Sequence, residues 1–179
     1  MTNRKKLVTE MGRIDRDAFA QSQKLPLVVV LDNVRSLHNV GSVFRTSDAF
    51  RVECIMLCGI TATPPSAEIH KTALGAEDVV DWKYYESTMD AVAELRSQGY
   101  RIYSIELCQG SIALQDFVTA PGERYAVVFG NEVKGVQQDV VDASDGAIEI
   151  PQFGTKHSLN VSVTAGMVIW EFAKKLGLV

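Results

Sequence analysis

Short apolar runs alternate with polar, helix-like stretches along most of the chain. Four runs, rich as a group in Val, Ile and Tyr, are bounded by turn residues: 27–31, 54–57, 101–107 and 125–129. Runs of this length and composition predict buried strands. Because helix-like stretches separate them, the pattern favours an α/β fold with a mostly parallel sheet and helices on both of its faces.

Two stretches have the spacing of amphipathic helices. The first, 88–97, is expected to end before Gly99 and to use one stripe of side chains: Met89, Val92, Ala93 and Arg96. The second, 161–176, ends in two lysines, where cations suit the helix dipole. It carries one apolar stripe: Val161, Ala165, Val168, Ile169, Phe172 and Leu176. Residues 61–66, with two consecutive prolines, predict an irregular surface loop.

Size and charge change this picture little. With 179 residues, 46% of them hydrophobic, the chain suits one compact domain, which we place at residues 25–179. Residues 1–24 are expected to form a short basic helical extension, because they hold six Lys or Arg against three Asp or Glu. The whole chain has a net charge of −4, which taken alone argues against nucleic acid. The extension could supply phosphate contacts, or it could be only a solvated helix.

Location and redox state follow from further absences in the sequence. No apolar run approaches the roughly 20 residues that span a bilayer, and the first residues lead into no signal-peptide stretch. We therefore expect a cytoplasmic protein without membrane contact. The cysteines Cys54, Cys58 and Cys108 are odd in number and lack the paired spacing of a zinc site. We expect buried, reduced thiols and no metal.

Three polar segments with glycines or small residues are candidates for chemistry. The first, 32–48, runs from a predicted strand into a helix, with Asn39 as the expected N-cap and Arg45 near the second turn. The second, 129–136, has two glycines and presents Glu132, and the third, 150–162, is dense in small polar residues. Each alone is explained about as well by a capped helix or a tight turn. Their placement after predicted strands is where ligands gather in open α/β sheets.

Together the three segments resemble the three motifs of the SpoU/TrmH RNA 2′-O-methyltransferases. The matching residues stand in the same order: Asn39-x-Gly41-x-x-x-Arg45-Thr46, then Phe129-Gly130-Asn131-Glu132-x-x-Gly135, then Ile150-Pro151 with Ser158-Leu159-Asn160-Val161-Ser162. The resemblance covers about residues 27–172. It implies a Rossmann-like, mostly parallel sheet with a C-terminal deep trefoil knot. It also implies a homodimer, with the terminal helix and the first-motif helix at the interface.

The resemblance further implies a cofactor, S-adenosyl-L-methionine, held in a bent shape by the second and third motifs. Main-chain contacts to this cofactor are implied for Gly130, Ile150 and Leu159, with the strand end at Leu107 nearby. No metal is implied, because the methylsulfonium group needs none. Asn131 is assigned no role.

The reaction implied is methyl transfer to a ribose 2′-hydroxyl, a poor nucleophile until its proton is removed. The resemblance assigns proton removal to Arg45, beside the cofactor of the other subunit. Because a guanidinium has a pKa above about 12, an alternative is that Arg45 grips an RNA phosphate while another group or water accepts the proton. Asn39 would hold Arg45 or the ribose, and Glu132 would position the RNA or orient Arg45. Ser158 and Asn160 would shape the site of transfer.

Two other functions stay open. A nucleotide-dependent oxidoreductase on a similar sheet would need a glycine fingerprint after residues 27–31, which is missing. A non-catalytic RNA-binding or assembly module is disfavoured by the intact motif residues. We favour tRNA over rRNA, because rRNA-modifying members often carry an extra N-terminal domain and about 25 residues precede the first strand here. His38 and His157 lie beside motif positions without an expected catalytic role, and His70 is expected at the surface.

Overall fold

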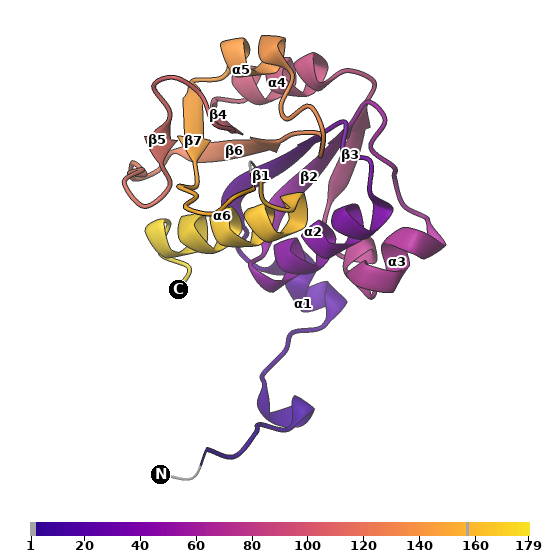
Figure 1. Cartoon of the computed structure of the whole chain (residues 1–179). Helices are drawn as coiled ribbons and strands as arrows, with labels where there is room; N and C mark the ends of the chain where they lie inside the picture. Colours follow the sequence, from indigo (N-terminus) through magenta and orange to yellow (C-terminus); the bar gives the residue numbers. More distant parts are fainter. Residues whose placement is uncertain (1–2, 157) are drawn as a thin grey trace.

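A sheet of seven parallel strands forms the centre of the protein (Figure 1). The structure is a computed structural model that describes residues 3–156 and 158–179. The strands are β1 (Leu25–Asp32), β2 (Val52–Cys58), β3 (Trp82–Tyr85), β4 (Tyr100–Ile105), β5 (Ile112–Ala113), β6 (Arg124–Phe129) and β7 (Gly146–Glu149). Their order is β3-β2-β1-β6-β4-β7-β5, and each neighbouring pair is parallel. The predicted α/β class is therefore confirmed.

Helices cover both faces of this sheet. They are α1 (Arg16–Gln21), α2 (Leu37–Ala49), α3 (Ala67–Ala73), α4 (Thr88–Ser97), α5 (Gln138–Ala143) and α6 (Val161–Lys175), with short 3-10 helices at Val8–Glu10 and Ala76–Asp78. In Figure 1, α4 and α5 lie above the sheet, and α2, α3 and α6 lie below it. Side chains along a strand point alternately to opposite faces. Accordingly, Val29 and Leu31 of β1 belong to the core between the sheet and helices α2 and α6. Val28 and Val30 belong to the core on the other face, between the sheet and α4.

The two predicted helices are present, and one buried stripe was predicted wrongly. In α6 the stripe is buried as expected, and only Leu176 falls outside, as the C-cap. In α4 the bounds are as predicted, but the buried residues are Thr88, Ala91, Val92 and Leu95. A ten-residue helix with few apolar positions fits more than one stripe. The observed one buries the large Leu95, and Thr88 is buried because its hydroxyl donates to Asp32 over 2.6 Å.

Some strand bounds and short strands also differ from the prediction. Strand β4 ends at Ile105, and Leu107 lies beyond it with 54% of its surface exposed. The backbone amide of Leu107 donates to the carboxylate of Glu106 over 2.9 Å and not to a neighbouring strand. Strands β3, β5 and β7 were not predicted, because none is longer than four residues. Residues 61–66 form an irregular loop, as expected.

The position of β6 between β1 and β4 brings distant segments together. It sets the carboxyl ends of β4, β6 and β7 side by side at one edge of the sheet. Asp32, fully buried at the end of β1, fixes the segment after β6, because its carboxylate accepts two hydrogen bonds of 2.8 Å from Gln137. The segments that carry the candidate chemistry are therefore tied to one another through the core.

Only the part of the basic extension before α1 lies apart from the sheet, because Phe19 of α1 is buried in the core. In Figure 1 the segment before α1 runs away from the body. Helix α1 is linked to the body by an ion pair of 2.9 Å between Arg16 and Asp78. Within the described residues, no helix is both long and apolar enough to cross a membrane. Cys58 is buried as expected, whereas Cys54 and Cys108 are only partly buried.

Candidate functional site

A cleft of about 690 Å³ opens at the carboxyl ends of β4, β6 and β7. It is lined by the segment after β4, the loop after β6, the loop after β7 and the first turn of α6. Most of the predicted site residues line it: Leu107, Gly130, Glu132, Ile150, Ser158, Leu159 and Asn160. Asn39 reaches the same network through hydrogen bonds, and Arg45 does not line the cleft.

The loop after β6 is a tight turn that requires both of its glycines. Asn131 and Gly135 exchange backbone hydrogen bonds of 3.0 and 2.9 Å. A Cβ atom on Gly130 would lie 2.0 Å from the carbonyl carbon of Gly135, and Gly135 itself has a φ of +71°. The turn therefore holds backbone against backbone, which leaves main-chain groups facing the cleft.

Asn131 is a structural residue of this turn that the sequence reasoning missed. Its side-chain oxygen accepts from the backbone amides of Val133 and Lys134 over 2.9 and 3.2 Å. Its side-chain nitrogen donates to the carbonyl of Asn33 over 2.8 Å, which joins the turn to the end of β1. An asparagine side chain in a turn commonly bonds the backbone two residues on. An asparagine between two closely spaced glycines, Gly130 and Gly135, therefore could have indicated a turn residue.

Glu132 fixes the start of α2. Its carboxylate accepts hydrogen bonds from the backbone amides of Arg35 and Ser36, over 2.9 and 3.0 Å, and from the side-chain amide of Asn39 over 3.1 Å. Partial burial opposes the ionisation of Glu132, but the hydrogen bonds from Arg35, Ser36 and Asn39, taken together with its own backbone amide, hold its pKa below the ordinary value. An anionic carboxylate also suits a helix N-terminus.

The N-cap of α2 is Ser36 and not Asn39, which corrects the prediction. The hydroxyl of Ser36 accepts from the backbone amide of Asn39 over 3.3 Å, so the helix begins three residues earlier than expected. Asn39 is thereby released from capping and lies buried between two other motifs. Its side-chain nitrogen donates to Glu132, and its side-chain oxygen accepts from Asn160 over 3.2 Å.

Asn160 joins the start of α6 to this network. It is the N-cap of α6, and its side-chain oxygen accepts from the backbone amides of Ser162 and Val163. Capping by Asn160 was predicted, while Ser158 lies two residues earlier and lines the cleft. The chain Glu132, Asn39, Asn160 therefore links one residue of each motif and sets the N-termini of α2 and α6 relative to the cleft.

Arg45 stands apart from this network. It is exposed on α2, six residues after Asn39. Within residues 3–156 and 158–179 its side chain forms no ion pair, and neither Asn39 nor Glu132 bonds it. Its guanidinium is therefore available to a molecule outside this chain.

A Glu132→Gln variant tests the tie between the loop after β6 and α2. An amide in this place presents a donor to the amides of Arg35 or Ser36, so we expect the free energy of unfolding at pH 7 to fall by about 1–2 kcal/mol. Because the pKa of Glu132 is lowered, its stabilisation is present above the ordinary glutamate pKa of about 4.3 and is lost as the pH falls below it. Urea unfolding at pH 7 and pH 3.5 measures both effects.

Glu86→Gln is the matched control for this variant. Glu86 is exposed, and its carboxylate forms no hydrogen bond within the described part of the chain. The control should unfold like the wild type at both pH values. A Glu132→Gln variant with wild-type stability at pH 7, or with a deficit that persists unchanged at pH 3.5, would contradict the assigned contacts.

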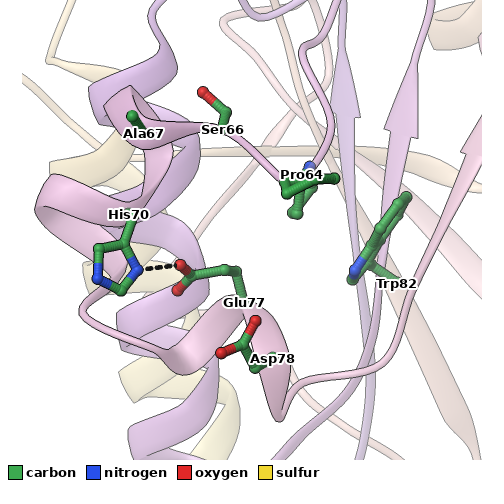
Figure 2. Close-up of a pocket in the computed structure, with 8 residues that line it drawn as sticks. Pro64, Ser66, Ala67, His70, Glu77, Asp78 and Trp82 are labelled. Carbon is green, nitrogen blue, oxygen red and sulfur yellow. Dashed lines mark hydrogen bonds and ion pairs between the residues drawn. The ribbon is translucent and has the colours of Figure 1, made fainter.

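A second pocket, of about 560 Å³, lies at the opposite edge of the sheet (Figure 2). It is lined by residues of the 61–66 loop, α3, the following 3-10 helix and β3: Pro64, Pro65, Ser66, Ala67, His70, Glu77, Asp78 and Trp82. His70 is exposed as expected, and its Nδ1 lies 2.5 Å from the buried carboxylate of Glu77. His38 lies at 3.1 Å from Glu68, and His157 lies outside the described residues. No predicted site residue lines this second pocket.

The described part of the chain holds no cluster of side chains suited to bind a metal ion. No group of three or more His, Cys, Asp and Glu residues there is placed to hold an ion. Two carboxylates, Glu106 and Glu149, line the first cleft, and both were missed by the sequence reasoning. Glu106 accepts from the backbone amide of Val136 over 3.1 Å, and Glu149 accepts from Ser111 over 2.5 Å.

Comparison with known proteins identifies the SpoU/TrmH methyltransferases as the similar proteins. Residues 26–170 match the SpoU rRNA Methylase family. A TrmH family protein of Staphylococcus haemolyticus is 32% identical over 173 residues, which cover 94% of this chain and 68% of the relative. A tRNA (guanosine(18)-2′-O)-methyltransferase of Thermus thermophilus is 29% identical over 164 residues, covering 91% of this chain and 82% of that protein.

Among solved structures, an AdoMet-bound rRNA methyltransferase from Sinorhizobium meliloti superposes with a TM-score of 0.78. The two sequences are 26% identical, and the match covers 89% of this chain and 59% of that one. This chain thus spans between about three fifths and four fifths of the proteins compared with it.

Proposed function

Since the chain belongs to the SpoU rRNA Methylase family, we propose that it transfers the methyl group of S-adenosylmethionine to a ribose 2′-hydroxyl of an RNA. The observation that carries the proposal is the cleft at the carboxyl ends of β4, β6 and β7. It gathers residues from the second and third motifs, and the first motif is tied to it through Asn39. Ligands of open α/β sheets bind at this end of the strands.

The cleft suits the cofactor in size and in the groups that it offers. A volume of about 690 Å³ is within the range of small-molecule sites. Gly130, Ile150 and Leu159 would offer main-chain contacts to the cofactor. Leu107, in the segment just after β4, would lie nearby. Glu106 and Glu149 place negative charge along the wall, which favours a cationic sulfonium. When bound, the cofactor supplies an electrophilic methyl group.

The remaining chemistry falls to the polar residues around the first turn of α6. Ser158 and Asn160 line the cleft and would hold the ribose, and Asn39 and Glu132 keep Asn160 in place. The 2′-hydroxyl must lose its proton as the bond to the methyl group forms. We assign this step to Arg45, either as the acceptor or as a charged clamp on the adjacent phosphate while water accepts the proton.

We infer that the protein works as a homodimer in which Arg45 serves the cleft of the other subunit. Helix α6 presents three exposed apolar side chains at helical spacing: Val163, Met167 and Trp170, each with more than 40% of its surface exposed. Helix α2, which carries Arg45, packs beside α6. An exposed apolar stripe of this kind marks an interface, and Arg45 lines neither of the two pockets described above.

Met167→Glu tests the dimer. A charge placed in the apolar stripe must be buried or the interface must open, so we expect a monomer by light scattering and a loss of methyl transfer. Ile60→Glu is the control, because Ile60 is 65% exposed on a loop after β2 and should leave a dimer. A monomeric wild type, or a dimeric and fully active Met167→Glu variant, would contradict this interface.

The strand order bears on one further part of the proposal, the knotted C-terminal region. Because β6 inserts between β1 and β4 after both have been laid down, and β7 is added beyond β4, the C-terminal third of the chain is suited to the trefoil knot of the family.

We place the activity in the cytoplasm and favour tRNA as the substrate. The Thermus thermophilus relative acts on tRNA, whereas the Sinorhizobium meliloti neighbour is an rRNA methyltransferase.

Label transfer tests the proposed function. The purified protein is incubated with methyl-labelled S-adenosylmethionine and, separately, with unmethylated tRNA and rRNA. We expect label in tRNA, at a ribose that becomes resistant to alkaline cleavage. Label in rRNA alone would replace the substrate and keep the chemistry. No transfer to either RNA, or tight binding of a nicotinamide dinucleotide without S-adenosylmethionine binding, would overturn the proposal.

A further inference from the structure

A phenylalanine stands fully in solvent beside the cleft. Phe153 has 97% of its surface exposed, on the loop between β7 and α6. The residue before it, Gln152, lines the cleft, and so does Ser158 farther along the same loop. An aromatic ring loses the favourable free energy of burial when it stays in water. Because its chain neighbour Gln152 lines the cleft, this exposed ring is placed to meet a ligand that extends out of the cleft.

The mouth of the cleft carries other exposed apolar side chains. Leu107, Val133 and Leu159 line the cleft with 54%, 75% and 39% of their surfaces exposed. We name these three residues and Phe153 the apolar rim. The same cleft is also lined by three carboxylates, Glu106, Glu132 and Glu149. A ligand that suits this arrangement has a flat apolar part outside and a polar part inside, as a nucleotide does.

The surroundings of Phe153 favour a nucleic acid over another protein surface. Lys156 is exposed on the same loop, and Lys134 lines the cleft. Aromatic rings interleaved with cations are the usual platform for unpaired bases and their phosphates. The loop is also open to solvent around Gly154. A Cβ atom on Gly154 would meet nothing within 4 Å, and residues 152–156 form no hydrogen bond to other described residues.

We propose that Phe153 is the stacking platform for the base of the nucleotide that is methylated, with Lys134 and Lys156 beside its phosphates. The inference rests on the proposed function. If Ser158 and Asn160 hold the ribose, the attached base must leave the cleft through its mouth, where the apolar rim lies. A base stacked there is displaced from its own RNA stack, and the ring replaces the lost stacking contact.

Steady-state kinetics on the RNA fraction that accepts label from the wild type tests this platform. We expect Phe153→Ala to raise the KM for RNA about 10-fold, by analogy with single stacking contacts, and to leave the dissociation constant of S-adenosylmethionine unchanged by calorimetry. Phe153→Trp should restore the KM, because it keeps an aromatic face. Phe153→Leu should not, because it keeps only apolar bulk. Val118→Ala, at a residue 82% exposed on a different loop, is the control.

Each contrary outcome identifies another role for the ring. Weaker cofactor binding by Phe153→Ala would place the ring over the cofactor, and a monomeric variant would place it in the subunit interface. An unchanged KM, or full rescue by leucine, would remove the stacking contact. All four results overturn the platform while wild-type label transfer still supports the proposed function. Absence of wild-type transfer to any RNA is a separate result, which removes the function and the platform together.

Discussion

Replacing Gly130 with alanine is expected to weaken the binding of S-adenosylmethionine by about 10- to 100-fold, the range that overpacking of a rigid site predicts. The added Cβ would lie 2.0 Å from the carbonyl carbon of Gly135 and 2.1 Å from the amide nitrogen of Val136. Both atoms belong to the backbone, so no side-chain rotation relieves the clash. The turn must open, which moves main-chain groups at the cleft wall. Isothermal titration with the cofactor measures the loss.

Gly154→Ala is the matched control for this result. Gly154 lies in the other loop of the cleft region, its Cβ would meet nothing within 4 Å, and its φ is not positive. Circular dichroism and thermal unfolding separate local from global effects, because the clash lies in one turn and the core contacts of β6 remain. Cofactor binding by a folded Gly130→Ala variant as tight as that of Gly154→Ala would contradict the close approach.

Arg45→Ala is expected to lower kcat for methyl transfer by about 10²- to 10⁴-fold, the contribution typical of a group that assists proton transfer. Cofactor affinity should stay unchanged, because Arg45 lies outside the cleft of its own chain. Arg45→Lys separates charge from geometry, since a lysine keeps the cation but cannot form the two parallel hydrogen bonds of a guanidinium. Near-normal turnover by Arg45→Lys would count against both the base and the phosphate clamp.

Mixing the two variants shows which subunit uses Arg45. Homodimers of Arg45→Ala lack the guanidinium, and homodimers of Gly130→Ala stay largely without cofactor when its concentration is set to fill only a wild-type cleft. In a mixed dimer, the Arg45→Ala subunit keeps an intact cleft and receives Arg45 from its partner. We therefore expect co-expressed, differently tagged subunits to recover activity in one of two clefts. A mixed dimer as inactive as its parents would show that Arg45 serves its own chain.

The sequence predicted the strands that are long and apolar, and it failed where structure depends on distant contacts. The runs that became β1, β2, β4 and β6 and the stripe of α6 follow from local periodicity. Strand β7 has only four residues, begins at Gly146 and is held by pairing with β4. Its pairing partner lies over forty residues away in the chain, so no local pattern reveals it.

The candidate site shows the same division. Motif resemblance picked out several residues that line the cleft but missed Glu106 and Glu149, and the contacts of Glu132 could not be read from it. That carboxylate meets the amides of Arg35 and Ser36, 97 and 96 residues earlier in the chain. Asn39 was expected to cap a helix because it stands where a polar loop runs into the helix. Ser36 serves as the cap instead, with Glu132 beside it.

The insertion of β6 also sets the order in which the protein can fold. Leu27 of β1 pairs with Tyr125 of β6, about a hundred residues later in the chain. Bringing together two segments so far apart in the chain lowers the conformational entropy of the chain before the contacts between them form. Folding is therefore slow. During synthesis, β1 and β4 keep open edges until residues 124–129 leave the ribosome, and open edges invite aggregation. The cleft closes last, so a chain becomes able to bind its cofactor only when its folding is complete.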